Sequence, residues 1–164
     1  MTDRKYLHGK INKKEVRGLL RSLDERTKIY FGCDSIRFKI KGQWYAEYTT
    51  VLVVHKNGCH GCKIFAQVDR EKDTDQKAGR PFNRMMNEAY RVAEIYLEFE
   101  DLLYEFVLEH EIHLDINEDD IHGSSVAVKA ASGYVQGLCN VVPILKPTAY
   151  AASYAADRGR RLTA

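Results

Sequence analysis

The chain has 164 residues, 45% of them hydrophobic, which is enough for one compact domain, expected to span residues 1–164. No stretch approaches the roughly 20 apolar residues of a membrane span, and the start of the chain lacks an apolar signal core, which predicts a cytoplasmic protein without membrane contact. The net charge is only +2, but residues 1–41 hold twelve Lys and Arg against five Asp and Glu, whereas residues 85–122 hold twelve acids and a single Arg. Such a distribution suits a polyanion held at its edges that meets cations in the middle, although ordinary solvated faces would produce it too.

A first helix is predicted at about residues 13–24, as an N-terminal extension of the domain. Asn12 and Glu15 form a capping-box pattern, with asparagine in place of serine or threonine. Apolar residues follow at helical spacing: Val16, Leu19, Leu20 and Leu23.

Residues 28–36, KIYFGCDSI, predict a strand that is apolar on both faces and therefore central in a sheet. This strand carries Asp34 near its C-terminal end. A buried carboxylate needs a cation or several hydrogen-bond donors. The nearest basic residues along the chain, which lie on a segment that continues as strand or turn, are Arg37, Lys39 and Lys41. We therefore expect Asp34 to be a metal ligand.

Two further strands are predicted at residues 43–55 and 63–68, the first joined to the central strand by a hairpin turn at Lys41-Gly42. Residues 69–81, DREKDTDQKAGRP, lack apolar periodicity and predict an exposed loop.

The turn before residue 63 contains a small group of potential metal or redox ligands, namely His55, Cys59, His60 and Cys62. A structural zinc site usually draws on two ligand pairs, and the chain has no second C-x-x-C pair. A redox pair of the thioredoxin type opens a helix rather than a hairpin. The sequence therefore favours a structural turn, with zinc binding or a redox role for Cys59 and Cys62 as the alternative.

The longest helix is predicted at about residues 83–108. Its buried stripe is expected to contain Met85, Ala89, Val92, Tyr96, Phe99, Leu103 and Val107, and its solvent stripe Glu94, Glu98, Asp101 and Glu105. Glu88 belongs to neither stripe, because it projects roughly 40° from Val92, at the border of the core face. It is thus the acid of this helix that we expect near Asp34, a carboxylate in water at the rim being the alternative.

Residues 111–117, EIHLDIN, alternate strictly and predict a strand parallel to the central one. Sites in such sheets form at the C-terminal ends of parallel strands, so Asp115 is expected next to Asp34. His113 shares its face and is interpreted as a packed neighbour rather than a ligand. In the loop at 118–123, His122 is a candidate for proton transfer.

The remaining chain predicts a helix at about 124–138, an edge strand at 140–145 and a terminal helix that carries Asp157. The whole pattern is α/β, with a mixed five-stranded sheet of three antiparallel hairpin strands plus two parallel strands, flanked by helices.

The four acids Asp34, Glu88, Asp115 and Asp157 occur in an order that resembles the ribonuclease H-like fold. In particular, GCDS at 32–35, HLDIN at 113–117 and KPTAYAASYAAD at 146–157 resemble motifs of the YkuK-type family of predicted ribonuclease H relatives. The resemblance implies a nuclease, a hydrolase of phosphodiester bonds whose substrate is RNA, an RNA–DNA hybrid or structured DNA.

The resemblance also implies a site that holds two Mg²⁺ or Mn²⁺ ions. Asp34 would bridge both ions, Asp115 and Glu88 would complete one, and Asp157 would complete the other. Two divalent ions about 4 Å apart suit phosphodiester hydrolysis, and such hard cations prefer oxygen ligands. Thr148 departs from the family pattern, in which an acid commonly follows Lys-Pro. If that acid is the working ligand, Asp157 is a bystander.

A second function is compatible with the same residues. The chain would then be a non-catalytic ribonuclease H-like module that binds nucleic acid or a protein through its basic N-terminal third. The threonine at position 148 and the border position of Glu88 favour this alternative, which predicts binding without metal-dependent turnover.

Overall fold

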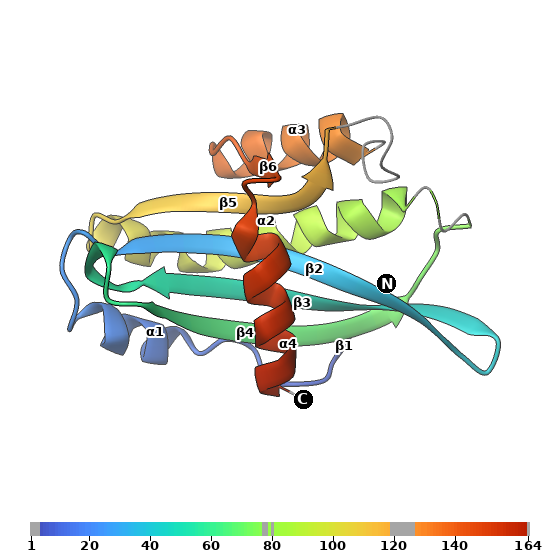
Figure 1. Cartoon of the computed structure of the whole chain (residues 1–164), viewed down its shortest axis with the longest axis horizontal. Coiled ribbons are helices and arrows are strands. Elements are labelled where there is room, and N and C mark those ends of the chain that lie inside the picture. Colours follow the sequence, from blue (N-terminus) through green and yellow to red (C-terminus); the bar gives the residue numbers. More distant parts are fainter. Residues whose placement is uncertain (1–3, 77–78, 80, 119–126, 164) are drawn as a thin grey trace.

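The computed structural model describes residues 4–76, 79, 81–118 and 127–163, which form a mixed α/β structure around one sheet (Figure 1). The strand order is β1-β4-β3-β2-β5-β6. The strands are β1 (Lys5–Tyr6), β2 (Lys28–Ile40), β3 (Gln43–His55), β4 (Cys62–Lys72), β5 (Glu109–Asn117) and β6 (Ile144–Lys146). Pairing is antiparallel from β1 to β2 and parallel from β2 through β5 to β6. The predicted mixed sheet is confirmed, and the two-residue β1 adds a sixth strand to the five expected.

Helices cover both faces of this sheet, as Figure 1 shows. They are α1 (Lys13–Leu20), α2 (Phe82–Glu105), α3 (Val128–Cys139) and α4 (Ala156–Thr163), together with a 3₁₀ turn at Lys56–Gly58 and a π-helical turn at Ala151–Ala155. α4 crosses the face opposite to the one covered by α1 and α2. β2 is therefore central and covered on both faces, as its apolar pattern predicts.

Local sequence explains where the helices begin and end. The side chain of Asn12 accepts hydrogen bonds from the backbone N–H groups of Lys14 and Glu15, so the predicted cap starts α1. This helix ends at Leu20 rather than near residue 24. α2 ends at Glu105, and Val107, which was expected in the buried stripe, is instead 80% exposed with a φ of 53°. A β-branched residue in that region cannot continue a helix, so this prediction is wrong.

The β2–β3 hairpin is longer than predicted, because β2 continues to Ile40. Lys41 and Gly42 form its two-residue turn with φ values of 45° and 87°, a geometry that glycine adopts without strain. The prediction of an exposed loop from residue 69 is wrong in its first part. β4 runs to Lys72, and the side chain of Asp69 is fully buried.

The core has two parts, one on each face of the sheet. The larger part lies between the sheet and α1, α2 and α3, and the smaller one lies under the C-terminal segment. Gly159 allows α4 to approach the strands, because a Cβ atom there would lie 2.9 Å from the Cβ of Ala66 and 3.1 Å from Cγ1 of Val51. Within the described ranges, no helix is both long and apolar enough to cross a membrane.

Candidate active site

Asp34 and Asp115 lie side by side on the two central parallel strands. The residues that precede them, Cys33 and Leu114, are register partners in the β2–β5 pairing. Both carboxyl groups are largely buried, with side-chain exposures of 23% for Asp34 and 14% for Asp115. Burial, the negative charge of Asp115 and a hydrogen bond between the two carboxyl groups raise the pKa of Asp34 to about 6. The two strands thus gather negative charge where a cation would be stabilised.

Glu88 reaches the same region from α2, on the other face of the sheet. Its side chain is not at the rim, because the residue is only 1% exposed. Ser35 donates a 2.5 Å hydrogen bond from Oγ to Oε1 of Glu88, whereas Oε2 has no hydrogen-bond partner among the described residues. Burial and the nearby charges of Asp34 and Asp115 raise the pKa of Glu88 well above its ordinary value. The third carboxylate is therefore buried, close to the other two, and only half satisfied.

Two cations that the sequence did not point to lie against the aspartates. Nζ of Lys146, on β6, is 2.6 Å from Oδ1 of Asp115, and Nη2 of Arg160, on α4, is 3.3 Å from Oδ2 of Asp34. Burial lowers the pKa of Lys146, but the hydrogen bond and charge of Asp115 outweigh this effect and raise it overall. Both basic residues come from the C-terminal segment, so this segment supplies counter-ions as well as an acid.

Asp157 does not contact Asp34 or Asp115 directly among the contacts of the described residues; it is linked to Asp34 through Arg160. Its side chain is 49% exposed and pairs with Arg161 at 2.9 Å and with Arg160 at 3.6 Å. The guanidinium of Arg160 therefore lies between Asp157 and Asp34. Thr148 stays within the backbone turn after β6, donating from Oγ1 to the carbonyl oxygen of Leu145.

His113 is a packed neighbour, as its position on β5 predicted. It is fully buried, its Nε2 lies 2.8 Å from a carboxylate oxygen of Glu111, and its Nδ1 accepts a hydrogen bond from the backbone N–H of Ala151. The rings of Tyr30 and Tyr150 pack against it. His113 thereby anchors the start of the segment that leads to α4. The other candidate histidine, His122, lies outside the described residues.

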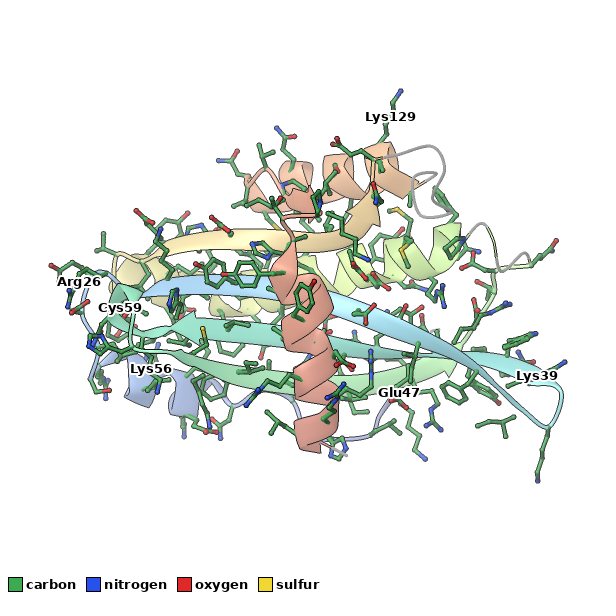
Figure 2. All side chains as sticks on the ribbon, in the orientation of Figure 1. Arg26, Lys39, Glu47, Lys56, Cys59 and Lys129 are labelled. Atoms are coloured by element: carbon green, nitrogen blue, oxygen red, sulfur yellow. The ribbon has the colours of Figure 1, made fainter. Side chains whose placement is uncertain are left out.

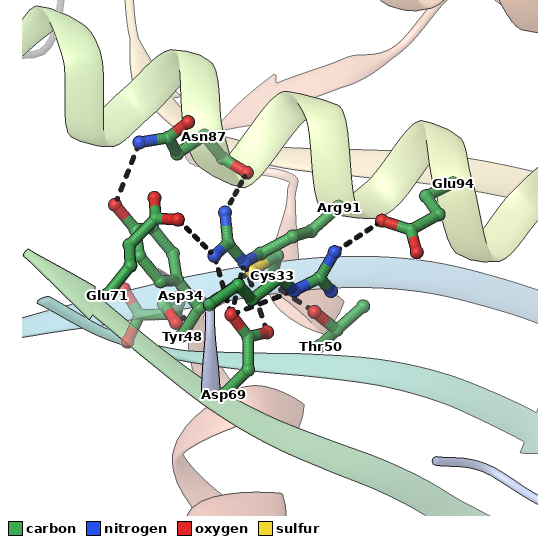
Figure 3. Close-up of polar contacts among 10 residues, drawn as sticks. Cys33, Asp34, Tyr48, Thr50, Asp69, Glu71, Asn87, Arg91 and Glu94 are labelled. Carbon is green, nitrogen blue, oxygen red and sulfur yellow. Dashed lines mark hydrogen bonds and ion pairs between the residues drawn. The ribbon is translucent and has the colours of Figure 1, made fainter. Parts of the chain in front are cut away.

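A buried ionic network joins α2 to β4 (Figure 3). Arg91, one helical turn after Glu88, donates to both carboxylate oxygens of Asp69, with 2.5 Å between its Nη2 and Oδ2, and its Nη2 lies 3.3 Å from Glu71. Arg4 also pairs with Asp69, at 3.0 Å. Asp69 and Glu71 were missed because their charges were attributed to a solvated loop, although the alternation of the strand continues through both residues.

The cysteine-containing turn lies at the opposite end of the sheet from the β2–β3 hairpin, as the labels of Cys59 and Lys39 in Figure 2 show. Cys59 and Cys62 are exposed free thiols, and Sγ of Cys59 is 3.8 Å from Nδ1 of His60. The segment forms the predicted turn, between β3 and β4. Across the part of the chain that the structure describes, no three His, Cys, Asp or Glu side chains are arranged to hold a metal ion together, either here or at the carboxylates.

The chemistry of the carboxylate cluster nevertheless suits a divalent cation. Three acids interact electrostatically in one region, although their side chains are not arranged to hold an ion together as they stand. Two of them have raised pKa values, and Oε2 of Glu88 is buried without a hydrogen-bond partner among the described residues. Hard cations such as Mg²⁺ and Mn²⁺ prefer such ligands, and clustered carboxylates cannot all remain charged without them. In this structure Arg160 and Lys146 supply part of that compensation.

The protein is thus an α/β protein in which acids from two strands, β2 and β5, and from one helix, α2, lie in the same region. A family model described as "Ribonuclease H-like" matches residues 14–161. The chain belongs to this ribonuclease H-like family, which confirms the resemblance drawn from its motifs and indicates a role in nucleic-acid hydrolysis or binding. A search of curated proteins and a search of solved structures each found no match.

Removing the charge of Asp34 is expected to stabilise the metal-free protein above pH 6. The pKa of Asp34 is about 6 in the folded state, against 3.8 for the unperturbed group. Between pH 3.8 and about pH 6, the carboxyl group is therefore protonated in the folded state and ionised in the unfolded state. The free energy of unfolding therefore falls as pH rises from about 4 to about 6 and stays lower above. In EDTA at pH 8, Asp34→Asn should be more stable than wild type by on the order of 2 kcal/mol, and the difference should vanish near pH 4.

Urea unfolding at the two pH values measures this difference. Asp157→Asn serves as the matched control, because this carboxylate is half exposed and Asp34 is retained. Its free energy of unfolding should fall with pH as that of wild type does, and should differ from wild type by less than about 1 kcal/mol at both pH values. A variant Asp34→Asn that is less stable than wild type at pH 8 would mean that Arg160 compensates the charge of Asp34 fully.

Proposed function

We propose that this protein is a metal-dependent nucleic-acid phosphodiester hydrolase of the ribonuclease H-like type, with RNA, an RNA–DNA hybrid or structured DNA as substrate. The proposal rests above all on the convergence of Asp34, Asp115 and Glu88, three carboxylates from separate elements whose mutual repulsion is only partly relieved by neighbouring cations. Family membership adds the class of reaction.

Asp34, Asp115 and Glu88 are the residues that would hold one divalent ion, and Asp34 with Asp157 would hold a second. Such ions, when bound, activate water and stabilise the departing oxyanion of a phosphodiester. Asp34 would have to exchange Arg160, and Asp115 would have to exchange Lys146, for these ions. The two basic side chains would then be free to bind the phosphate groups of the substrate, which keeps the polyanion in register with the carboxylates.

The test is cleavage by the purified protein. We expect labelled RNA, RNA–DNA hybrid or branched DNA to be cut in the presence of Mg²⁺ or Mn²⁺, and the same reactions to stop in EDTA, because the carboxylates alone cannot stabilise a leaving oxyanion. Product analysis on denaturing gels with all three substrates also identifies the preferred one. Absence of metal-dependent products from every substrate would contradict the proposal.

A second candidate function is a non-catalytic ribonuclease H-like module that binds nucleic acid or a protein. One observation favours it: Lys146 and Arg160 already pair with Asp115 and Asp34, as permanent substitutes for metal ions would. This function predicts that nucleic acid or a protein partner binds equally well in EDTA and in Mg²⁺ and that no substrate is cut. Cleavage and binding assays on the same preparation separate the two functions.

A further inference from the structure

The end of the β2–β3 hairpin carries an apolar and basic surface on the same side of the sheet as Asp34. We call it the hairpin face; it consists of Ile36, Phe38, Ile40, Tyr45, Arg70 and Lys72. Alternation along β2 places every second residue after Asp34 on one face. Across the strands, Phe38 is the register partner of Tyr45, and Tyr45 that of Lys72. The hairpin face therefore continues directly from the candidate active site.

Side-chain contacts show that this surface is built rather than incidental. The rings of Phe38 and Tyr45 stack with 6.1 Å between their centroids and 21° between their planes, and the guanidinium of Arg70 lies 4.7 Å from the Phe38 centroid. Glu47 holds Arg70 in place through a 3.0 Å ion pair. The two rings and the guanidinium thus form one stacked cluster, and aromatic and arginine side chains are the groups on which nucleobases stack.

The hairpin face is open to a ligand. α4 packs on this side at Val51 and Ala66, nearer the middle of the sheet, and the hairpin extends well beyond it (Figure 1). On this face Ile36 and Ile40 are 40% and 41% exposed, and Phe38 and Tyr45 are half-buried. A pocket of about 290 Å³ opens between Ile40 and the neighbouring basic strand β4. Its volume is near the lower end for ligand pockets, so it would take one nucleobase rather than a large molecule.

Basic residues occur in the N-terminal third and also around the pocket of the hairpin face. Arg4, Lys13 and Arg17 pair with the acidic stripe of α2, with distances of 2.6 Å to Glu94, 2.6 Å to Asp101 and 3.3 Å to Glu105. These charges are therefore neutralised within the protein. At the hairpin end, Lys5, Arg70 and Lys72 line the pocket. Arg70 also pairs with Glu47, and Glu71 turns inward to Arg91.

We propose that the hairpin face binds a single-stranded segment of nucleic acid adjoining the phosphodiester at the carboxylates. Bases pack on Phe38, Tyr45 and Ile40, and the backbone phosphates contact Arg70 and Lys72. The inference rests on the proposed function only in taking nucleic acid as the ligand. Phe38 lies four residues from Asp34 along β2, which is about 13 Å at the rise of an extended strand. One continuous strand of a few nucleotides can thus reach both places.

The combination of side chains selects an unpaired strand. In a duplex the bases stack on one another inside the helix, so their faces cannot pack on the rings and aliphatic side chains of the hairpin face. An unpaired strand exposes base faces as well as phosphates, so it can contact both the apolar and the basic residues. A protein partner would also cover the apolar residues. The basic residues Arg70 and Lys72 and the position of the hairpin face next to the carboxylates proposed to bind metal ions favour a nucleic acid instead.

Fluorescence anisotropy in EDTA tests the proposal without cleavage. The probes are fluorescein-labelled single strands of RNA and DNA of about 16 nucleotides and a blunt duplex of the same sequence. Phe38→Ala combined with Tyr45→Ala should weaken single-strand binding by about tenfold or more and leave duplex binding nearly unchanged, because only stacking is lost. Lys72→Ala should weaken binding of each single strand by about threefold or more and lower its salt dependence by about one phosphate contact.

Matched controls lie on the opposite face of the same hairpin. Trp44→Ala removes an aromatic residue that packs on Arg37, and Lys39→Ala removes a lysine next in sequence to Phe38. Both should bind the probes within about twofold of wild type. Equal losses from the two faces, no loss from Lys72→Ala, or wild type that prefers the duplex would overturn the proposal. Lys72 is exposed, so Lys72→Ala should leave the fold intact, and this result decides the matter even if the aromatic variant is unstable.

Cleavage assays on the same variants keep this inference separate from the proposed hydrolase. Binding that depends on the hairpin face, without metal-dependent products, would support the inference and contradict the hydrolase. Metal-dependent products that are unaffected by Phe38→Ala with Tyr45→Ala, together with unchanged binding, would do the reverse.

Discussion

Asp34→Asn is expected to lower metal-dependent cleavage by about 10³-fold or more while the protein stays folded. The carboxylate is the one group that would contact both divalent ions, and loss of about 4 kcal/mol of transition-state stabilisation corresponds to roughly this factor. Asparagine keeps the shape of the side chain and removes its charge, so packing beside Asp115 is retained. Initial rates on a labelled substrate at saturating Mg²⁺, compared between wild type and the variant, measure the effect.

Glu109→Gln is the matched control for this experiment. Glu109 is also an acid on β5 and shares the face of Asp115, but it lies at the far end of the strand, 2.7 Å from Lys28, and its side chain is 74% exposed. Its rate should remain within about twofold of wild type, because exposed ion pairs contribute little. A rate for Asp34→Asn within tenfold of wild type would show that Asp34 does not contact both metal ions, even though the chain has the ribonuclease H-like fold.

The same cleavage assay also tests whether Asp157 is a metal ligand. This acid is connected to Asp34 only through the guanidinium of Arg160, and it has a second arginine partner in Arg161. If Asp157 holds the second ion, Asp157→Asn should resemble Asp34→Asn in its metal dependence. If it only orients Arg160, the variant should retain most of its activity and respond normally to metal concentration. Thr148, held in its turn, offers no replacement acid.

The elements that carry the acids could be predicted because each has a strong local pattern. The apolar run before Asp34 and the strict alternation around Asp115 fixed two strands, and their parallel pairing follows from the long helix between them. The angular position of Glu88 on that helix pointed to the same place. Its near-complete burial was not predictable, because that depends on the depth at which α2 packs on the sheet.

The partners of these acids could not be predicted from local pattern. Arg160 pairs with Asp34 across 126 positions of sequence, and nothing in a run of alanines and arginines specifies that contact. Asp69 was misassigned for the same reason: a charged residue in a charged stretch predicts solvent, unless its distant partner is known. The alternation of β4, read through Asp69 and Glu71, was the available signal, and charge density obscured it.

Arg91→Met is expected to destabilise the protein by about 3–5 kcal/mol, the largest stability effect that the structure points to. Arg91 is 3% exposed, and its guanidinium contacts Asp69 and lies 3.7 Å from the ring centroid of Tyr48. Methionine fills similar space, but it leaves the fully buried Asp69 with Arg4 and without Arg91, and it leaves Glu71 without its arginine. Urea unfolding followed by circular dichroism measures the loss.

Arg17→Met provides the matched control, since Arg17 pairs with Asp101 and Glu105 on the solvent side of α2 and should cost less than about 1 kcal/mol. Adding Asp69→Leu and Glu71→Gln to Arg91→Met should recover part of the loss, because the penalty comes from unpaired buried charge rather than from lost packing. If the combined variant is no more stable than Arg91→Met alone, the packing of Arg91 on Tyr48 dominates. Glu88 lies one turn before Arg91 on α2. A shift of α2 in Arg91→Met would therefore also displace Glu88, and cleavage should fall even where the protein is still folded.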